Sequence, residues 1–277
     1  MNRTLAVVGL VASLGTVSMG CAGSETGNGA RPRGKLPVSI EMRLLGPGAL
    51  LTMVDRGGTA FTIDSAVASV DRIEFMLPAG EQCEGLPGEV QSYSAACGGE
   101  SDRVRIDGPW VVDLVSGEFE PALEGIDVLD GVFDRIEMKL SAGEAGAGGV
   151  VAGDALDGAT LDVGGTVALT GSDTRPFGLT LSMTVQSRFQ DGGAVTIGPD
   201  ADRVQLSLDI GNWLSTLDLG ACIGQGEVPS SDGVLRLESA PRAACGDVAR
   251  AVRQALSQTG KARVQENPSS ERSVGND

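Results

Sequence analysis

The chain has 277 residues and is strongly acidic, with 37 Asp and Glu against 21 Lys and Arg and a formal net charge of −16 at pH 7. A field of this sign repels nucleic acid, whose binding requires clustered Lys and Arg. The chain contains no histidine, which excludes Ser-His-Asp and Cys-His catalysis and His-based zinc sites. The composition therefore favours a protein that is not an enzyme and uses no metal or other cofactor.

Residues 1–20 have the pattern of a bacterial export signal. Met1, Asn2 and Arg3 form a short cationic start, and a mostly apolar run without charges follows it. This run is interrupted by Gly and Ser, whereas a permanent transmembrane helix needs about 20 predominantly apolar residues. The sequence therefore predicts a cleaved signal peptide rather than a membrane span.

The segment Ser18-Met19-Gly20-Cys21 resembles the lipobox of bacterial lipoproteins, in which a small residue precedes the cysteine that is lipidated. Ser18 stands where these proteins usually have Leu, Val or Ile. The resemblance implies lipidation of Cys21 as the mature N-terminus, and the alternative is an ordinary secretory signal cleaved nearby. Ala22 follows in place of Asp, which by the same resemblance implies an outer-membrane location, on either its periplasmic or its surface face.

Four cysteines remain once Cys21 is set aside, namely Cys83, Cys97, Cys222 and Cys245. An even number in an exported chain predicts disulfides. Of the three possible connectivities, proximity in sequence favours Cys83 with Cys97 and Cys222 with Cys245. A zinc or redox role is disfavoured because the chain has neither Cys-x-x-Cys spacing nor histidine.

Short runs of alternating apolar residues dominate the chain from residue 36 to residue 245 and predict an all-β fold, an antiparallel β-sandwich. The expected strands cover residues 38–44, 60–63, 66–77, 104–106, 110–115, 133–140, 159–169, 177–188, 194–197, 203–210 and 234–237. The Gly-rich segment 143–153 is either a division between two half-domains or a long loop.

The two ends of the mature chain have a different composition. Residues 21–35 are small, polar and glycine-rich and predict a flexible tether. Residues 246–260 predict a short helix capped by Asp247. Residues 261–277 are polar and aperiodic, and we expect them to form a disordered tail.

One sequence pattern recurs along the chain. The segment DRIEFML at 71–77 returns as DRIEMKL at 134–140 and more weakly as DRVQLSL at 202–208. Because side chains alternate across a strand, Ile73, Phe75 and Leu77 should share one sheet face and Arg72 and Glu74 the other. We expect three equivalent strands whose Arg and Glu side chains are solvated on the outer face, and a duplicated half-domain is the alternative.

Three stretches resemble a family of bacterial envelope lipoproteins with a β-sandwich domain of unknown function, the DUF4382-like family. They are AFTIDSAVASVDRIEF, GPWVVDLVSG with the following PALEGIDVLDGVFDRIEMKL, and VQLSLDIGNWLSTLDLG. The residues that match the family's strands are Trp110, Asp113, Leu114, Gly131, Phe133, Arg135, Ile136 and Leu140. Phe133 replaces the usual Tyr, and the loop between Cys83 and Cys97 is additional. The resemblance implies a sandwich on a lipid anchor and carries over no catalytic or binding residues.

Few residues remain as candidates for a ligand site. Asp154, Asp157 and Asp162, together with Asp200 and Asp202, could furnish oxygen ligands for Ca²⁺, which takes about six to eight. Their spacing matches no EF-hand or nonapeptide repeat, so we expect solvated turn acids and no metal site. Trp110 and Trp213 should be core anchors rather than a platform for sugars.

The sequence thus predicts a lipid-anchored envelope protein that acts as a non-enzymatic interaction or structural module. Its expected partners are the membrane, through lipid on Cys21, and an envelope protein or a glycan. The alternative functions are a surface module that binds calcium or a glycan and, third, a hydrolase that uses carboxylates alone.

Overall fold

The computed structural model describes residues 35–45, 51–81, 96–97, 102–169 and 173–266. These residues belong to one unit that begins at Arg33. The predicted signal peptide, Cys21, nearly all of the tether, Cys83 and residues 267–277 lie outside the described residues, so the predictions that rest on them stand as predictions. Among the described residues, no helix has the length and apolar character needed to cross a bilayer.

The described chain consists mainly of β-strands. They are β1 (Lys35–Leu45), β2 (Thr52–Val54), β3 (Ala60–Met76), β4 (Ala96–Cys97), β5 (Arg103–Asp113), β6 (Phe119–Glu120), β7 (Ile126–Leu129), β8 (Gly131–Phe133), β9 (Arg135–Leu140), β10 (Leu161–Ala168), β11 (Thr174–Leu181), β12 (Val185–Gln190), β13 (Val195–Ile197), β14 (Ala201–Asp209), β15 (Ser230–Ser231), β16 (Val234–Arg236) and β17 (Thr259–Glu266). The helical elements are α1 (Leu219–Gly224), the 3-10 turn η1 (Leu237–Ser239), α2 (Arg242–Cys245) and α3 (Val248–Leu256). The prediction of an all-β, sandwich-like fold with a short C-terminal helix is confirmed.

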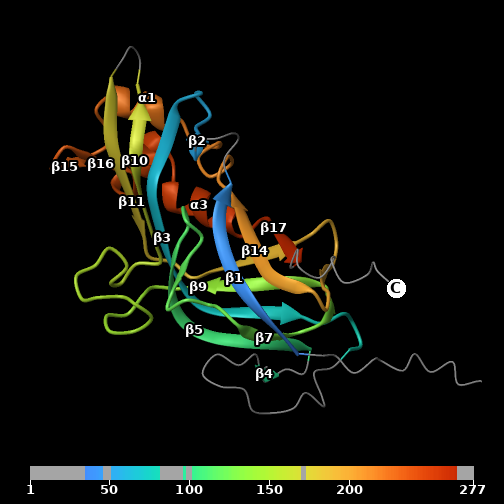
Figure 1. Cartoon of the computed structure of the whole chain (residues 1–277). Helices are drawn as coiled ribbons and strands as arrows, with labels where there is room; N and C mark the ends of the chain where they lie inside the picture. Colours follow the sequence, from blue (N-terminus) through green and yellow to red (C-terminus); the bar gives the residue numbers. More distant parts are fainter. Residues whose placement is uncertain (1–34, 46–50, 82–95, 98–101, 170–172, 267–277) are drawn as a thin grey trace, which may run out of the picture. The chain divides into compact units, whose positions relative to one another are not determined.

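Strand β3 connects the two parts of the main sheet (Figure 1). Its first half pairs with β2 and β10, and its second half pairs with β9, while β5 lies along its other edge from Val67 to Met76. The exchange of partners coincides with a bulge between Val70 and Arg72. A bulge bends a strand and increases its twist, so the sheet curls and its two parts face each other across the core.

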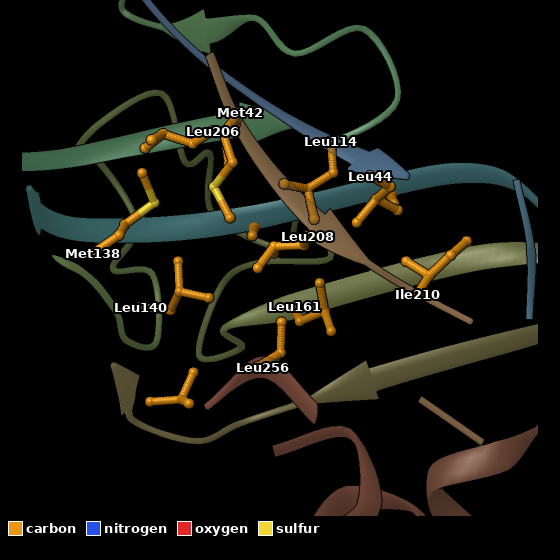
Figure 2. Packing of buried hydrophobic residues seen from close by; sticks show 14 of the residues in the cluster. Met42, Leu44, Leu114, Met138, Leu140, Leu161, Leu206, Leu208, Ile210 and Leu256 are labelled. Carbon is orange, nitrogen blue, oxygen red and sulfur yellow. The ribbon is translucent and has the colours of Figure 1, made fainter. Parts of the chain in front are cut away.

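The core lies between these two parts of the sheet. Figure 2 shows Met42 and Leu206 from β1 and β14, Met138 from β9, Leu161 from β10 and Leu256 from α3 pointing toward one another. All five residues are fully buried. Apolar side chains alternate along each contributing strand, which is why the period of two in the sequence identified so many of them.

The sheet is mixed rather than purely antiparallel. Strands β1 and β14, β11 and β16, and β12 and β17 pair in parallel. The expectation of an antiparallel sandwich is wrong for these three pairs. An alternating pattern indicates which residues face the core, but it is the same for a strand running in either direction. The pattern therefore cannot distinguish parallel from antiparallel pairing.

The expected strand at 177–188 is divided into β11 and β12 at residues 182–184. Thr160 holds this break, because its hydroxyl accepts a hydrogen bond from the Met183 N–H at 3.0 Å and donates one to the Met183 carbonyl oxygen. Thr160 is completely buried. Buried backbone N–H and C=O groups that are not paired within the sheet need other hydrogen-bond partners. The Thr160 hydroxyl is the partner of both groups of Met183.

The C-terminal region contains a strand that the sequence analysis did not predict. Asp247 does cap α3, accepting a hydrogen bond from the Arg250 N–H at 3.0 Å. The helix ends at Leu256, and β17 then runs from Thr259 to Glu266 between β12 and β14. The expected disordered tail at 261–277 is therefore wrong for residues 261–266, where Ala262 is fully buried.

The Gly-rich segment 143–153 does not divide the domain. Strands that precede it pair with strands that follow it, as β3 does with β10 and β1 with β14. The segment is a loop packed on β5. Gly148, with φ +57°, lies so close that an added Cβ would stand 2.5 Å from the Pro109 carbonyl oxygen.

Candidate functional site

Both tryptophans are core residues, and two of the candidate acids bond to the backbone of their own loop. Trp110 and Trp213 are each 1% exposed, which confirms them as core anchors. Asp154 and Asp157 accept backbone N–H bonds from Val151 and Gly153 at 2.9 and 3.0 Å.

The remaining candidate acids are similarly engaged or exposed. The Asp162 carboxylate accepts a hydrogen bond from the Thr180 hydroxyl at 2.6 Å, and Asp200 and Asp202 are exposed. No group of three or more Cys, Asp or Glu side chains is placed to hold a metal ion anywhere in the described ranges. The Asp side chains at 154 and 157 thus fix turns in their own loop.

Cys222 of α1 and Cys245 of α2 form a disulfide, with their Cα atoms 5.6 Å apart. Both side chains are buried. The bond closes the segment that carries β15, β16 and η1. Cys97 lies in β4, but Cys83 lies outside the described residues, so the second disulfide stays a prediction.

The most distinctive surface of the described chain is one face of the main sheet, which we call the cationic face. It consists of the outward side chains within residues 103–107 of β5, 71–76 of β3, 135–139 of β9, 186–190 of β12, 261–265 of β17, 203–207 of β14 and 39–43 of β1, which are neighbours in that order. The alternate residues of these windows point into the core. Ten of the outward side chains are cationic: Arg43, Arg72, Arg103, Arg105, Arg135, Lys139, Arg188, Arg203, Lys261 and Arg263.

Carboxylates on the cationic face are half as many as the cations. They are Glu41, Asp71, Glu74, Asp107 and Glu137. Asp102, directly before β5, also pairs with Arg103 at 3.0 Å, which leaves an excess of four positive charges on one face of a chain whose net charge is −16. Ten of the 21 Lys and Arg residues of the chain are thus gathered on seven adjacent strands. A surface with an excess of one sign of charge attracts ions and molecules of the opposite sign.

Two of the carboxylates are buried beneath the arginines. Glu74 and Glu137 are 3% and 4% exposed and stand directly opposite each other on β3 and β9. Like charges in that arrangement destabilise a sheet, and buried carboxylates require paired cations. The expectation that these glutamates are solvated is wrong, because it took account of the strand alone and not of the long side chains on its neighbours.

Each buried glutamate is shared by two arginines. Glu74 lies 3.5 Å from Arg72 and 3.6 Å from Arg103. Glu137 lies 2.5 Å from the Nε atom of Arg135 and 3.4 Å from that of Arg188. The Gln186 amide also donates a hydrogen bond to Glu137. The Glu137 group keeps one uncompensated positive charge, whereas Arg103 of the Glu74 group also pairs with Asp102 at 3.0 Å.

The third copy of the recurring pattern also has a carboxylate shared by two arginines, but the carboxylate comes from the neighbouring strand. It has Gln205 where the other copies have Glu, and the residue opposite Gln205 on β1 is Glu41. The Glu41 carboxylate lies 2.7 Å from Arg203 and 3.2 Å from Arg43. The pattern therefore has a structural meaning: it places an arginine two residues before a shared carboxylate, supplied by its own strand or by the neighbouring one.

The arginine donors are not fully used within the cationic face. The buried Nε atoms of Arg43, Arg72 and Arg203 have no hydrogen-bond partner in the described part of the chain, and neither has the Oε2 atom of Glu41. A guanidinium group has five N–H donors, and one carboxylate shared between two arginines cannot accept them all.

Lys261 and Arg263, on β17 between β12 and β14, provide the unpaired charge of the face. Both are exposed, and no carboxylate of the described residues lies within 4.0 Å of either one, whereas the other eight cations have acidic partners. Both belong to the part of β17 from residue 261 onward, which the sequence analysis assigned to the tail. The alternation of Ala262 and Val264 with Lys261, Arg263 and Gln265 was the available signal for this strand.

Comparison with known proteins adds little to this description. No protein-family profile and no curated protein matches the chain. Among solved structures, MbnP from Methylosinus trichosporium is similar at a TM-score of 0.35 and 10% sequence identity, over 69% of this chain and 80% of that one. A likeness of this size carries no argument about function, and the resemblance to the DUF4382-like family is not addressed by it.

Proposed function

We propose that this chain is a lipid-anchored envelope protein that acts as a non-enzymatic binding module, with the cationic face as its binding surface. The supporting observation is the excess of four positive charges, with Asp102 counted, on the outward side of seven adjacent strands, in a protein of net charge −16. The partner is an acidic component of the envelope. Such a face accelerates association with an anionic partner and gives specificity through complementary charge.

The anchor and the face have separate roles in this proposal. Lipid on Cys21 holds the protein at the membrane, since each buried CH₂ contributes roughly 0.8 kcal/mol and more than one acyl chain makes anchoring stable. The cationic face then selects what the tethered domain contacts. We find no observation that favours the alternative of a calcium-binding module, because the Asp154 and Asp157 carboxylates accept bonds from their own loop.

Fractionation of cells tests both roles in one design. Cys21→Ala should abolish labelling by a lipid precursor, because the acyl acceptor is removed, and persistent labelling refutes the anchor. In this lipid-free background the chain should still be retained partly by the envelope fraction at low salt. Adding Lys261→Glu and Arg263→Glu should release it, since the two substitutions remove the unpaired charge of the face.

The matched control is Arg250→Glu with Arg253→Glu in the same background. These residues are exposed on α3, whose buried side belongs to the core, and the pair changes the net charge by the same amount. Retention should be unchanged in this control. Equal release of both pairs would mean that total charge, rather than the cationic face, governs retention.

A further inference from the structure

We propose that the cationic face docks on the anionic phosphate headgroups of the lipid leaflet that holds the chain's own anchor. This inference rests on the proposed function and names its partner. The face spans seven strands, and neighbouring strands are about 4.8 Å apart, so it measures roughly 30 Å along the curled sheet. Its cations are spread over this width rather than gathered at one point. An extended anionic surface matches that distribution.

The side chains of the cationic face favour lipid phosphates over a glycan. Recognition of sugars relies largely on stacking against exposed aromatic rings. Among the described residues, all six Phe and both Trp are buried, at 6% exposure or less, and none of them lies on this face. The remaining aromatic residue, Tyr93, lies outside the described residues. Arginine, by contrast, presents a planar set of donors that fits phosphate oxygens. Eight of the ten cations on this face are arginines.

The acidity of the remaining chain does not prevent docking. The Debye length is about 8 Å at physiological ionic strength, and packed sheets lie about 10 Å apart. Carboxylates on the opposite side of the sandwich are therefore screened from a surface that touches the cationic face. The asymmetry instead orients the domain, with its cationic face toward the headgroups and its acidic side away from them.

The tether brings the face within reach of the membrane. The predicted tether ends at Lys35, where β1 begins, and β1 itself contributes Arg43 to the cationic face. Thirteen residues lie between Cys21 and Lys35, and a chain of that length extends at most about 50 Å. So short a tether keeps the domain at a high effective concentration near the lipid headgroups. A modest attraction per cation is therefore sufficient for docking.

Cosedimentation with vesicles tests this inference. The probe protein is the mature chain, residues 21–277, with Cys21→Ala, and the vesicles are phosphatidylcholine alone or an equal mixture with phosphatidylglycerol. We expect binding to the mixed vesicles only, with loss at high salt. Lys261→Glu with Arg263→Glu should weaken binding by about thirtyfold or more, from the usual contribution of each cation near an anionic surface, and Arg250→Glu with Arg253→Glu should not.

Two outcomes would overturn the inference, and they differ in what they say of the proposed function. If mixed vesicles fail to bind the parent while envelope retention still depends on Lys261 and Arg263, the partner is an acidic protein or polysaccharide and the proposed function stands. If substitution of Lys261 and Arg263 changes neither vesicle binding nor envelope retention, the proposed function fails as well. Circular dichroism of each variant separates loss of binding from loss of fold.

Discussion

Glu137→Gln is expected to lower the free energy of unfolding by about 3 kcal/mol, at the lower end of the cost of breaking a buried ion pair. The Glu137 side chain is 5% exposed and is shared by Arg135, Arg188 and Gln186. The substitution keeps the shape of the side chain and leaves two neighbouring guanidinium groups without their shared carboxylate. The cost stays at the lower end because these arginines reach solvent, Arg188 with 58% of its side chain exposed.

Equilibrium denaturation in urea measures this change. Arg188→Ala is the matched control, because it removes one exposed cation from the same group and leaves Glu137 paired with Arg135. The control should cost less than about 1 kcal/mol, as exposed ion pairs do. A smaller effect for Glu137→Gln than for Arg188→Ala would show that the buried carboxylate does not hold the arginines of the cationic face.

Replacing both Cys222 and Cys245 with Ala is expected to lower the free energy of unfolding by about 3 kcal/mol. The bond closes a loop with a sequence separation of 23 residues, and in the chain-entropy model a loop of this length restricts the unfolded state by about that amount. The loop includes β16, which pairs with β11 at one end of the sheet order. Leu235 and Leu237, both within it, are core residues.

Thermal and urea unfolding of the double variant provide the measurement. The parent protein under a thiol reductant is the natural control, and its stability should fall to that of the double variant. The variant itself should be insensitive to the reductant. A difference below about 1 kcal/mol between variant and parent would mean that the surrounding core, rather than the bond, holds this segment in place.

The parts of the fold that depend on local pattern were predictable from the sequence. The alternation of apolar residues placed Ile73, Phe75 and Leu77 in the core, and the position of Asp247 before an amphipathic run identified the cap of α3. Each of these features is set by residues within a few positions of one another. Sequence proximity also favoured the pairing of Cys222 with Cys245 that the structure contains.

The candidate site was not predictable in the same way, because it is assembled across strands. The burial of Glu74 and Glu137 depends on their standing opposite each other and on arginines from β5 and β12. Glu41 substitutes for the glutamate missing beside Arg203 only through the parallel pairing of β1 with β14. Register and strand direction are long-range properties, and one strand's pattern does not contain them.

The recurring pattern was identified in the sequence, but its role follows only from the structure. Its Arg-x-Glu unit places two opposite charges on the same side of one strand. The antiparallel pairing of the first two copies then brings their glutamates together, so that further arginines from neighbouring strands are needed. The resulting excess of arginine over glutamate accounts for much of the positive charge on the cationic face.

Arginine-modification footprinting is the most direct test of the claim that the cationic face is the binding surface. The mature lipid-free chain is treated with phenylglyoxal, with and without vesicles that contain phosphatidylglycerol, and modified sites are quantified by mass spectrometry. We predict that the vesicles protect Arg188 and Arg263, while Arg250 and Arg253 on α3 react equally in both conditions. Unchanged reactivity of Arg188 and Arg263, or protection of the α3 arginines in their place, would contradict the account.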